Sequence, residues 1–113
     1  MHVLLVDDDT SFRRSLAIGL ESAGVRVLEA KSGMEALEIL YSHQTRLDQV
    51  KSVVVDARMP GLDGFWLTDQ INVLYPDLKV IILSAHSYPY LLDRYTLMEK
   101  PVNINHLKEM LSK

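Results

Sequence analysis

The residues best suited to chemistry in this sequence are five polar side chains, each at or within two residues of the end of a short apolar run: Asp7, Asp8, Asp56, Ser84 and Lys100. Short apolar runs bounded by polar or turn residues are typical of strands buried on both faces of a parallel sheet. The carboxyl ends of such strands share one edge, where open α/β sheets bind their ligands. The spacing therefore predicts that several carboxylates, one hydroxyl and one ammonium lie close together.

A cluster of this composition requires positive charge. Two carboxylates about 5 Å apart repel each other by roughly 3 kcal/mol at an effective dielectric constant of ~20. Lys100 can supply one charge. A hard divalent ion bound through oxygen can supply more, and Mg²⁺ is the usual ion where phosphate chemistry occurs. The pattern therefore favours a Mg²⁺ site at this edge of the sheet.

The elements that would position these side chains alternate between strand and helix. Apolar runs predict strands over Val3–Val6, Val25–Glu29, Val53–Val55, Lys79–Leu83 and Tyr95–Met98. Capping residues predict helix starts at Asp9 or Thr10, at the Ser32–Glu35 capping box, at Asp63 and at Asn103. Apolar residues at helical spacing follow each cap, namely Phe12, Leu16, Leu20 and Ala23; Ala36, Leu37, Leu40 and Tyr41; Trp66, Leu67, Ile71 and Leu74; and Ile104, Leu107, Met110 and Leu111. Repeated strand–helix units predict a parallel sheet with helices on both sides.

One connection departs from this alternation. The segment His86–Arg94 is short and contains Pro89, so a full helix there would be cramped. Elsewhere Gly24 stands where a helix stop belongs, and the residue before Pro76 ends the third helix. The segment from Ser42 to Lys51 is polar, and the end of the second helix within it is not defined by the pattern.

Composition limits the class of protein. The 113 residues are 48% apolar and 24% charged, as in one ordinary globular domain, and we treat residues 1–113 as a single domain. A net charge of −3 argues against a nucleic-acid-binding surface. With no Cys and no membrane-length apolar run, the sequence fits the cytoplasm. No basic stretch precedes the first strand, so we expect no signal peptide.

Four segments in order resemble the response-regulator receiver domains of two-component signalling. They are Val3–Asp9, Asp56–Gly64, Leu83–Ala85 and Glu99–Pro101. The resemblance covers essentially the whole chain, and each segment falls at a predicted strand end. It implies the chemotaxis-type receiver fold, a flavodoxin-like (βα)5 three-layer sandwich with strand order 2-1-3-4-5. Here we expect the fourth helix to be shortened or irregular.

The resemblance also implies a metal site. Asp8 would bind Mg²⁺ directly, and Asp7 would act through water. Asp56 and the backbone carbonyl of Arg58 would complete the protein ligands.

Phosphoryl transfer would then take place at Asp56, the implied phosphoacceptor. A sensor histidine kinase or a histidine phosphotransfer protein would supply the phosphoryl group, and an output domain or protein would respond. Ser84 and Lys100 would each contact a phosphoryl oxygen, and the Lys100–Pro101 peptide would be cis. These roles agree with the physics of phosphoryl transfer, which depends on positioning and charge neutralisation. Such a domain is a signalling phosphoacceptor and not a turnover enzyme.

Three features of the sequence bear on how the domain would switch. Receivers usually have more than the 16 positions that separate Ser84 from Lys100 here. Leu97 stands where the family usually has a Tyr or Phe, while Tyr95 would face the same side of the strand. Arg58 and His86 occupy positions that tune phosphoryl lifetime in the family.

Two other functions stay open at this point. The first is a pseudo-receiver that binds partners without phosphorylation, which the short fourth-helix region favours. The second is a phosphatase of the haloacid-dehalogenase type, with Asp7 and Asp9 as its Asp-x-Asp pair. That reading lacks a later acidic pair near the C-terminus. The joint placement of the five polar residues favours the receiver over both.

Overall fold

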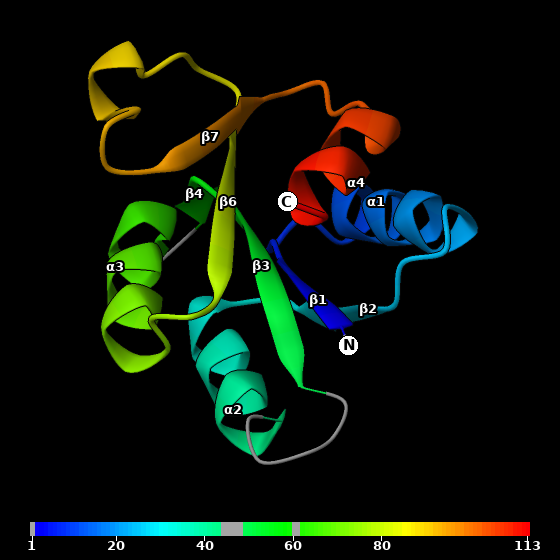
Figure 1. Ribbon diagram of the computed structural model, residues 1–113, viewed down its shortest axis with the longest axis horizontal. Helices are drawn as coiled ribbons and strands as arrows, with labels where there is room; N and C mark the ends of the chain where they lie inside the picture. The colour runs from blue at the N-terminus through cyan, green and yellow to red at the C-terminus, as the bar shows by residue number, and fades with distance from the viewer. Residues whose placement is uncertain (1, 44–48, 60–61) are drawn as a thin grey trace.

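The computed structural model describes residues 2–43, 49–59 and 62–113. Its centre is a five-stranded parallel sheet in the order β2-β1-β3-β6-β7 (Figure 1). The strands are β1 His2–Val6, β2 Val27–Ala30, β3 Val50–Asp56, β6 Lys79–Ser84 and β7 Thr96–Glu99. Counted in chain order, these five strands run 2-1-3-4-5 across the sheet. The predicted flavodoxin-like topology is therefore confirmed.

Helices cover both faces of this sheet. They are α1 Thr10–Ser22, α2 Gly33–His43, α3 Gly64–Leu74 and α4 Ile104–Leu111. Figure 1 shows α1 and α4 together on one face, and α2 and α3 together on the other. The three-layer sandwich therefore follows the prediction, with α4 as the C-terminal helix.

The central strand β3 contributes to two separate cores because its side chains alternate between the faces of the sheet. Val53 and Val55 pack into the core under α2 and α3. Val54 packs into the core under α1 and α4. All three are at most 2% exposed, so β3 is held rigidly from both sides.

The predicted caps begin the helices as expected. Asp9 accepts a hydrogen bond from Phe12 N, Asp63 from Phe65 N, and Asn103 from His106 N. Ser32 Oγ accepts from Glu35 N, while Glu35 Oε1 accepts from Lys31 N. Gly24 follows α1 with a φ of +89°, a conformation that favours glycine at a helix end.

Several predicted boundaries and faces differ from the structure. Strand β2 begins at Val27 and not at Val25, because Val25 N donates back to Leu20 O at the end of α1. The side chain of Tyr41 is 80% exposed, although the spacing assigned it to the inner face of α2. Leu40 takes the inward position there, and the next residue lies about 100° further round the helix.

The buried face of α3 is also narrower than the spacing of its apolar residues predicted. Leu67 and Ile71 are fully buried, whereas Trp66 and Leu74 are about half exposed, at 49% and 58%. The predicted polar segment from Ser42 to Lys51 includes residues 44–48, which lie outside the described residues.

The connection between β6 and β7 is the irregular part of the fold. It contains the 3-10 turn η1 (Pro89–Leu91), visible at the upper left of Figure 1, and no α-helix in residues 85–95, all of which are described. Arg94 and Tyr95 both donate backbone N–H groups to Leu91 O, which closes the turn before β7. The expected shortened fourth helix is thus a single tight turn. A short antiparallel pair, β4 Arg58–Met59 with β5 Leu62–Asp63, was not predicted.

Candidate functional site

The register of the sheet brings the predicted site residues to one edge. Val6 pairs with Val55 across β1 and β3, and Asp56 pairs with Leu83 across β3 and β6. Because Ser84 pairs with Glu99 across β6 and β7, Lys100 follows at the same level. Asp7, Asp56, Ser84 and Lys100 therefore come from four different strand ends but meet at one level of the sheet.

Three carboxylates form the acidic part of this edge. One oxygen each from Asp7, Asp8 and Asp56 lie within 4.8 Å of one another. Asp8 is exposed, Asp56 is half-buried, and Asp7 is only 5% exposed. Such proximity is unfavourable for three negative charges in a partly dry site.

Asp7 is the most buried of the three carboxylates and the least well compensated. Its Oδ1 accepts a hydrogen bond from Asp9 N at 2.9 Å. Its Oδ2 is buried and has no hydrogen-bond partner among the described residues. Burial, with a smaller contribution from the charge of Asp56, raises the pKa of Asp7 from 3.8 to about 6, although the Asp9 N–H and Lys100 oppose the shift. A buried carboxylate oxygen without a partner is costly unless something positive approaches it.

This donor set fits a hard divalent cation. The ligand atoms are all carboxylate oxygens, which Mg²⁺ prefers. A cation beside Asp7 would also satisfy the buried Oδ2 atom. The predicted fourth ligand, the backbone carbonyl of Arg58, stays a prediction.

Lys100 provides the positive side of the edge. Its Nζ donates to Asp56 Oδ1 at 2.9 Å, and the two side chains are 27% and 13% exposed. The same Nζ lies 4.3 Å from the centroid of the Phe12 ring. Lys100 N donates to Ser84 O at 2.8 Å, and the Lys100–Pro101 peptide is cis, as predicted.

Ser84 is buried at the end of β6, with 3% of its surface exposed. Its Oγ accepts a hydrogen bond from His86 N at 3.0 Å, which turns the chain sharply away from the sheet. The hydroxyl therefore sits on a rigid strand end beside Lys100. Its contact with a phosphoryl oxygen stays a prediction.

The residues assigned to tuning and switching lie around this centre. Arg58 and His86 are both exposed, which leaves their side chains accessible from the site edge. Leu97 and Tyr95 pack against the same core cluster, so the expectation that they face one side is confirmed. The Tyr95 hydroxyl, however, donates to Asp69 Oδ1 in α3 at 2.9 Å.

Sequence reasoning missed two residues that hold the acidic edge. Arg13 Nη1 donates to the backbone carbonyl of Asp7 at 2.6 Å, while its Nε donates to Glu29 Oε1 at 2.9 Å. Arg13 thereby ties the loop after β1 to the end of β2. The sequence feature that could have identified Arg13 is its spacing of four residues from the cap Asp9, which places Arg13 one helical turn beyond the loop.

The second missed residue is Gly64, which the sequence analysis named only as the end of the segment Asp56–Gly64. A Cβ on Gly64 would lie 2.1 Å from the backbone oxygen of Asp56. Gly64 N also donates to Ala57 O at 3.0 Å. The first residue of α3 therefore packs directly on the backbone of Asp56.

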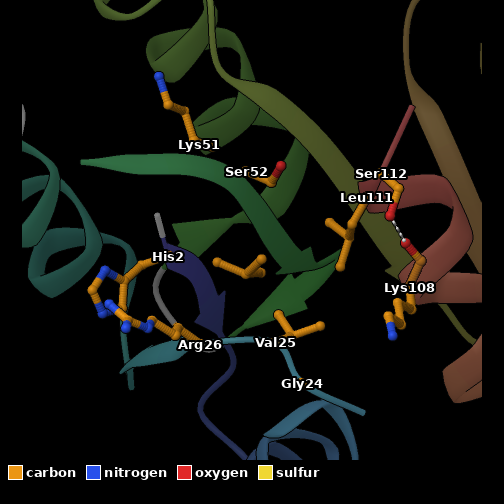
Figure 2. A pocket seen from close by; sticks show the side chains of 10 residues that line it. His2, Gly24, Val25, Arg26, Lys51, Ser52, Lys108, Leu111 and Ser112 are labelled. Atoms are coloured by element: carbon orange, nitrogen blue, oxygen red, sulfur yellow. Dashed lines mark hydrogen bonds between the residues drawn. The ribbon is translucent and has the colours of Figure 1, made fainter. Parts of the chain in front are cut away.

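A hollow of about 430 Å³ opens at the opposite, amino edge of the sheet (Figure 2). Basic residues surround it, including Arg26, Lys51 and Lys108. Lys108 Nζ donates to Ala23 O at the end of α1, and nearby Lys79 Nζ donates to Met110 O at the end of α4. Cations at helix carboxyl ends complement the helix dipole. Lys108 and Lys79 therefore act as carboxyl-terminal caps of α1 and α4.

Comparison with known proteins decides the family. The family model described as "Response regulator receiver domain" matches residues 3–112. The chain belongs to this family. The family is one of signalling domains, and the match sets aside the haloacid-dehalogenase alternative.

Curated relatives of the receiver are much longer proteins. The chain is 40% identical over 85 residues to the transcriptional regulatory protein GlrR of Escherichia coli K12, covering 75% of this chain and 18% of that protein. It is 37% identical over 116 residues to the two-component response regulator ARR12 of Arabidopsis thaliana, covering 97% of this chain and 19% of that protein. It is 35% identical over 121 residues to the sensor kinase CckA of Brucella abortus, covering 98% of this chain and 12% of that protein. The receiver thus spans less than a fifth of the length of these relatives.

Solved structures agree with the fold. The chemotaxis protein CheY4 of Vibrio cholerae superposes with a TM-score of 0.85 at 25% identity, covering 98% of this chain and 95% of that one. The response regulator TrrA of Thermotoga maritima, solved in complex with Mg²⁺ and BeF, gives a TM-score of 0.81 at 28% identity, covering 99% of this chain and 97% of that one. Among the described residues, the helices are too short or too polar to cross a membrane.

Proposed function

We propose that this receiver accepts a phosphoryl group on Asp56 from the phosphohistidine of a sensor kinase or a phosphotransfer protein. One observation carries the proposal. Asp56 lies within 4.8 Å of two further carboxylates and, through Oδ1, 2.9 Å from the Lys100 ammonium. Such an arrangement holds a nucleophilic carboxylate where charge can be neutralised on both sides.

The reaction requires little covalent chemistry from the protein. An Asp56 carboxylate oxygen attacks phosphorus, the new oxygen–phosphorus bond forms in line with the breaking nitrogen–phosphorus bond, and imidazole leaves. Lys100 moves its hydrogen bond from Asp56 to a phosphoryl oxygen, and the Ser84 hydroxyl donates to another. Because a carboxylate oxygen attacks without giving up a proton, no general base is needed.

Asp7, Asp8, Asp56 and the Arg58 carbonyl would hold Mg²⁺, the ion that their oxygen donors favour. When bound, the ion would neutralise charge on the phosphoryl oxygens. Asp7 has the clearest reason to take part, because a bound cation would satisfy its buried Oδ2 atom. We further propose that phosphorylation regulates an output domain or protein, in keeping with the much longer relatives.

The test uses small phosphodonors. Wild-type protein incubated with phosphoramidate or acetyl phosphate and Mg²⁺ is expected to gain one phosphoryl group, detected by intact mass. Asp56→Ala should abolish the gain. Asp63→Asn is the matched control, because Asp63 pairs with Arg58 close to Asp56 but its side chain caps α3, and it should keep the gain.

Two outcomes would contradict the proposal. One is a wild-type chain that stays unmodified, which would favour a pseudo-receiver that binds partners without phosphorylation. The other is a mass gain that survives Asp56→Ala, which would move the acceptor to another residue.

A further inference from the structure

The Lys100 ammonium lies between two groups of different chemistry. Its Nζ is 2.9 Å from Asp56 Oδ1 and 4.3 Å from the centroid of the Phe12 ring. An ammonium this close to an aromatic ring is attracted to the negative face of the ring. Phe12 comes from the first turn of α1, whereas Lys100 follows β7, so the contact joins distant parts of the chain.

The ring itself is well anchored. Phe12 is partly buried and packs against the core cluster under α1 and α4, which includes Leu16. The adjacent cap bond, from Phe12 N to Asp9 Oδ1 at 3.1 Å, orients the same residue. Phe12 therefore offers a preformed apolar face toward the site.

We propose that Phe12 is a positioning residue for phosphoryl transfer, one that holds the Lys100 ammonium against Asp56 and aims it at the incoming phosphoryl group. The inference rests on the proposed function. Phe12 would touch neither the phosphoryl group nor Asp56, and it would take no proton or electron pair. It would act only through the place and orientation of Lys100.

The chemistry of the ammonium explains why a ring suits this position. An ammonium has three N–H donors and no acceptor. One donor meets Asp56, and the ring attracts the charge without offering a lone pair that would compete strongly for a donor. A donor is thereby left for a phosphoryl oxygen. A polar side chain at position 12 would instead accept a hydrogen bond from Lys100 and draw it away from the site.

The first experiment compares Phe12→Leu with Phe12→Tyr in phosphorylation by phosphoramidate with Mg²⁺. Leucine keeps an apolar side chain but removes the π face, and we expect the rate to fall roughly fivefold. Tyrosine keeps the ring, so it should retain a rate within about twofold of wild type. Phe65→Leu is the matched control, since Phe65 is an aromatic residue that packs on Tyr88 and Tyr95, and its rate should be unchanged.

A double-mutant cycle separates positioning from mere packing. We would measure the unfolding free energies of wild type, Phe12→Leu, Lys100→Met and the double variant. The changes caused by the two substitutions should be non-additive, because either substitution alone already removes the contact between the ring and the ammonium. The NMR signals of the Lys100 side-chain protons should shift when the ring is removed by Phe12→Leu and stay near their wild-type positions in Phe12→Tyr. Neither measurement requires phosphorylation.

The outcomes are distinguishable. A modified wild type with an unaffected Phe12→Leu rate, or an additive cycle, overturns this inference alone. A wild type that takes no phosphoryl group overturns the proposed function, while the cycle and the NMR shift still report whether the contact exists.

Discussion

Two neighbouring regions of this receiver are built in different ways. The site edge takes each key residue from the end of a strand of the central sheet, and backbone bonds such as Lys100 N to Ser84 O fix their level. The β6–β7 connection instead carries a 3-10 turn with exposed apolar side chains, Tyr90 at 76% and Leu92 at 59%. Sheet register holds the chemistry in place even where the adjoining connection has lost its helix.

Side-chain contacts attach the β6–β7 connection to α3. The Phe65 ring packs in T-shaped arrangements with the rings of Tyr88 and Tyr95, at centroid distances of 5.5 and 5.1 Å. The Tyr95 hydroxyl donates to Asp69 in α3 at 2.9 Å. The connection is therefore tied to α3 by rings and one hydroxyl, whereas the site edge is tied by the sheet. We expect changes to the backbone packing at the site edge to be costly and changes in the connection to be mild.

The largest expected effect is that of Gly64→Ala. The new Cβ would lie 2.1 Å from the backbone oxygen of Asp56, so the backbone must move. We expect a loss of about 3 kcal/mol in the free energy of unfolding by urea, with impaired phosphorylation. Gly19→Ala is the control: its Cβ would lie 2.8 Å from Ile104 Cδ1, the end of a flexible side chain. It should change stability by less than about 1 kcal/mol. Equal losses in the two variants would contradict a rigid site edge.

A second prediction concerns Asp7→Asn in metal-free buffer. Because the pKa of Asp7 is raised to about 6, its proton is held more tightly in the folded state than in the unfolded state. Ionised Asp7 therefore destabilises the fold above pH 6, and the penalty vanishes as the pH falls below 3.8, the ordinary value. Asparagine should stabilise the protein by about 1 to 3 kcal/mol at pH 7.5 and by nearly nothing at pH 3.5.

Urea denaturation at the two pH values, with and without Mg²⁺, tests this prediction. Added Mg²⁺ should stabilise wild type more than Asp7→Asn, since binding to the folded state alone raises stability. A variant that is less stable than wild type at pH 7.5 without metal would contradict the account of Asp7.

The smallest expected effect is that of Tyr95→Phe in the connection. Loss of the bond to Asp69 should cost about 1 kcal/mol at pH 7, with the phosphorylation rate unchanged. Arg94→Ala is the control, because Arg94 lies 3.7 Å from the same Asp69 oxygen in an exposed pair and should contribute little. A large loss of phosphorylation in Tyr95→Phe would contradict the separation between the two regions.

Tyr95 also predicts a pH dependence. Burial, followed by the hydrogen bond to Asp69, raises the pKa of Tyr95 above its ordinary value of 10. The protonated Tyr95 hydroxyl therefore contributes its full stabilisation below pH 10. This stabilisation is lost as the pH rises through the higher pKa that Tyr95 has in the folded state. Urea denaturation between pH 9 and 11 should show a shallower loss for Tyr95→Phe than for wild type.

The sequence alone determined the order of elements and the composition of the site. Apolar runs ending in Asp7, Asp56 and Ser84 can be recognised because parallel strands buried on both faces carry no alternating pattern and stop at polar residues. Caps such as Asp63 were equally visible, since a helix start needs a local acceptor for its free N–H groups. Each of these signals depends only on residues that are close together in the sequence, so the sequence alone is enough to recognise them.

Only the tertiary structure decided how the five polar residues are held. The Phe12 ring beside Lys100, the Arg13 bond to the Asp7 carbonyl and the packing of Gly64 on Asp56 each depend on the meeting of different segments. The exposure of Tyr41 and Trp66 likewise follows from which side of each helix the sheet covers. Helical spacing identifies apolar residues, but the width of the buried stripe depends on the layer beneath it.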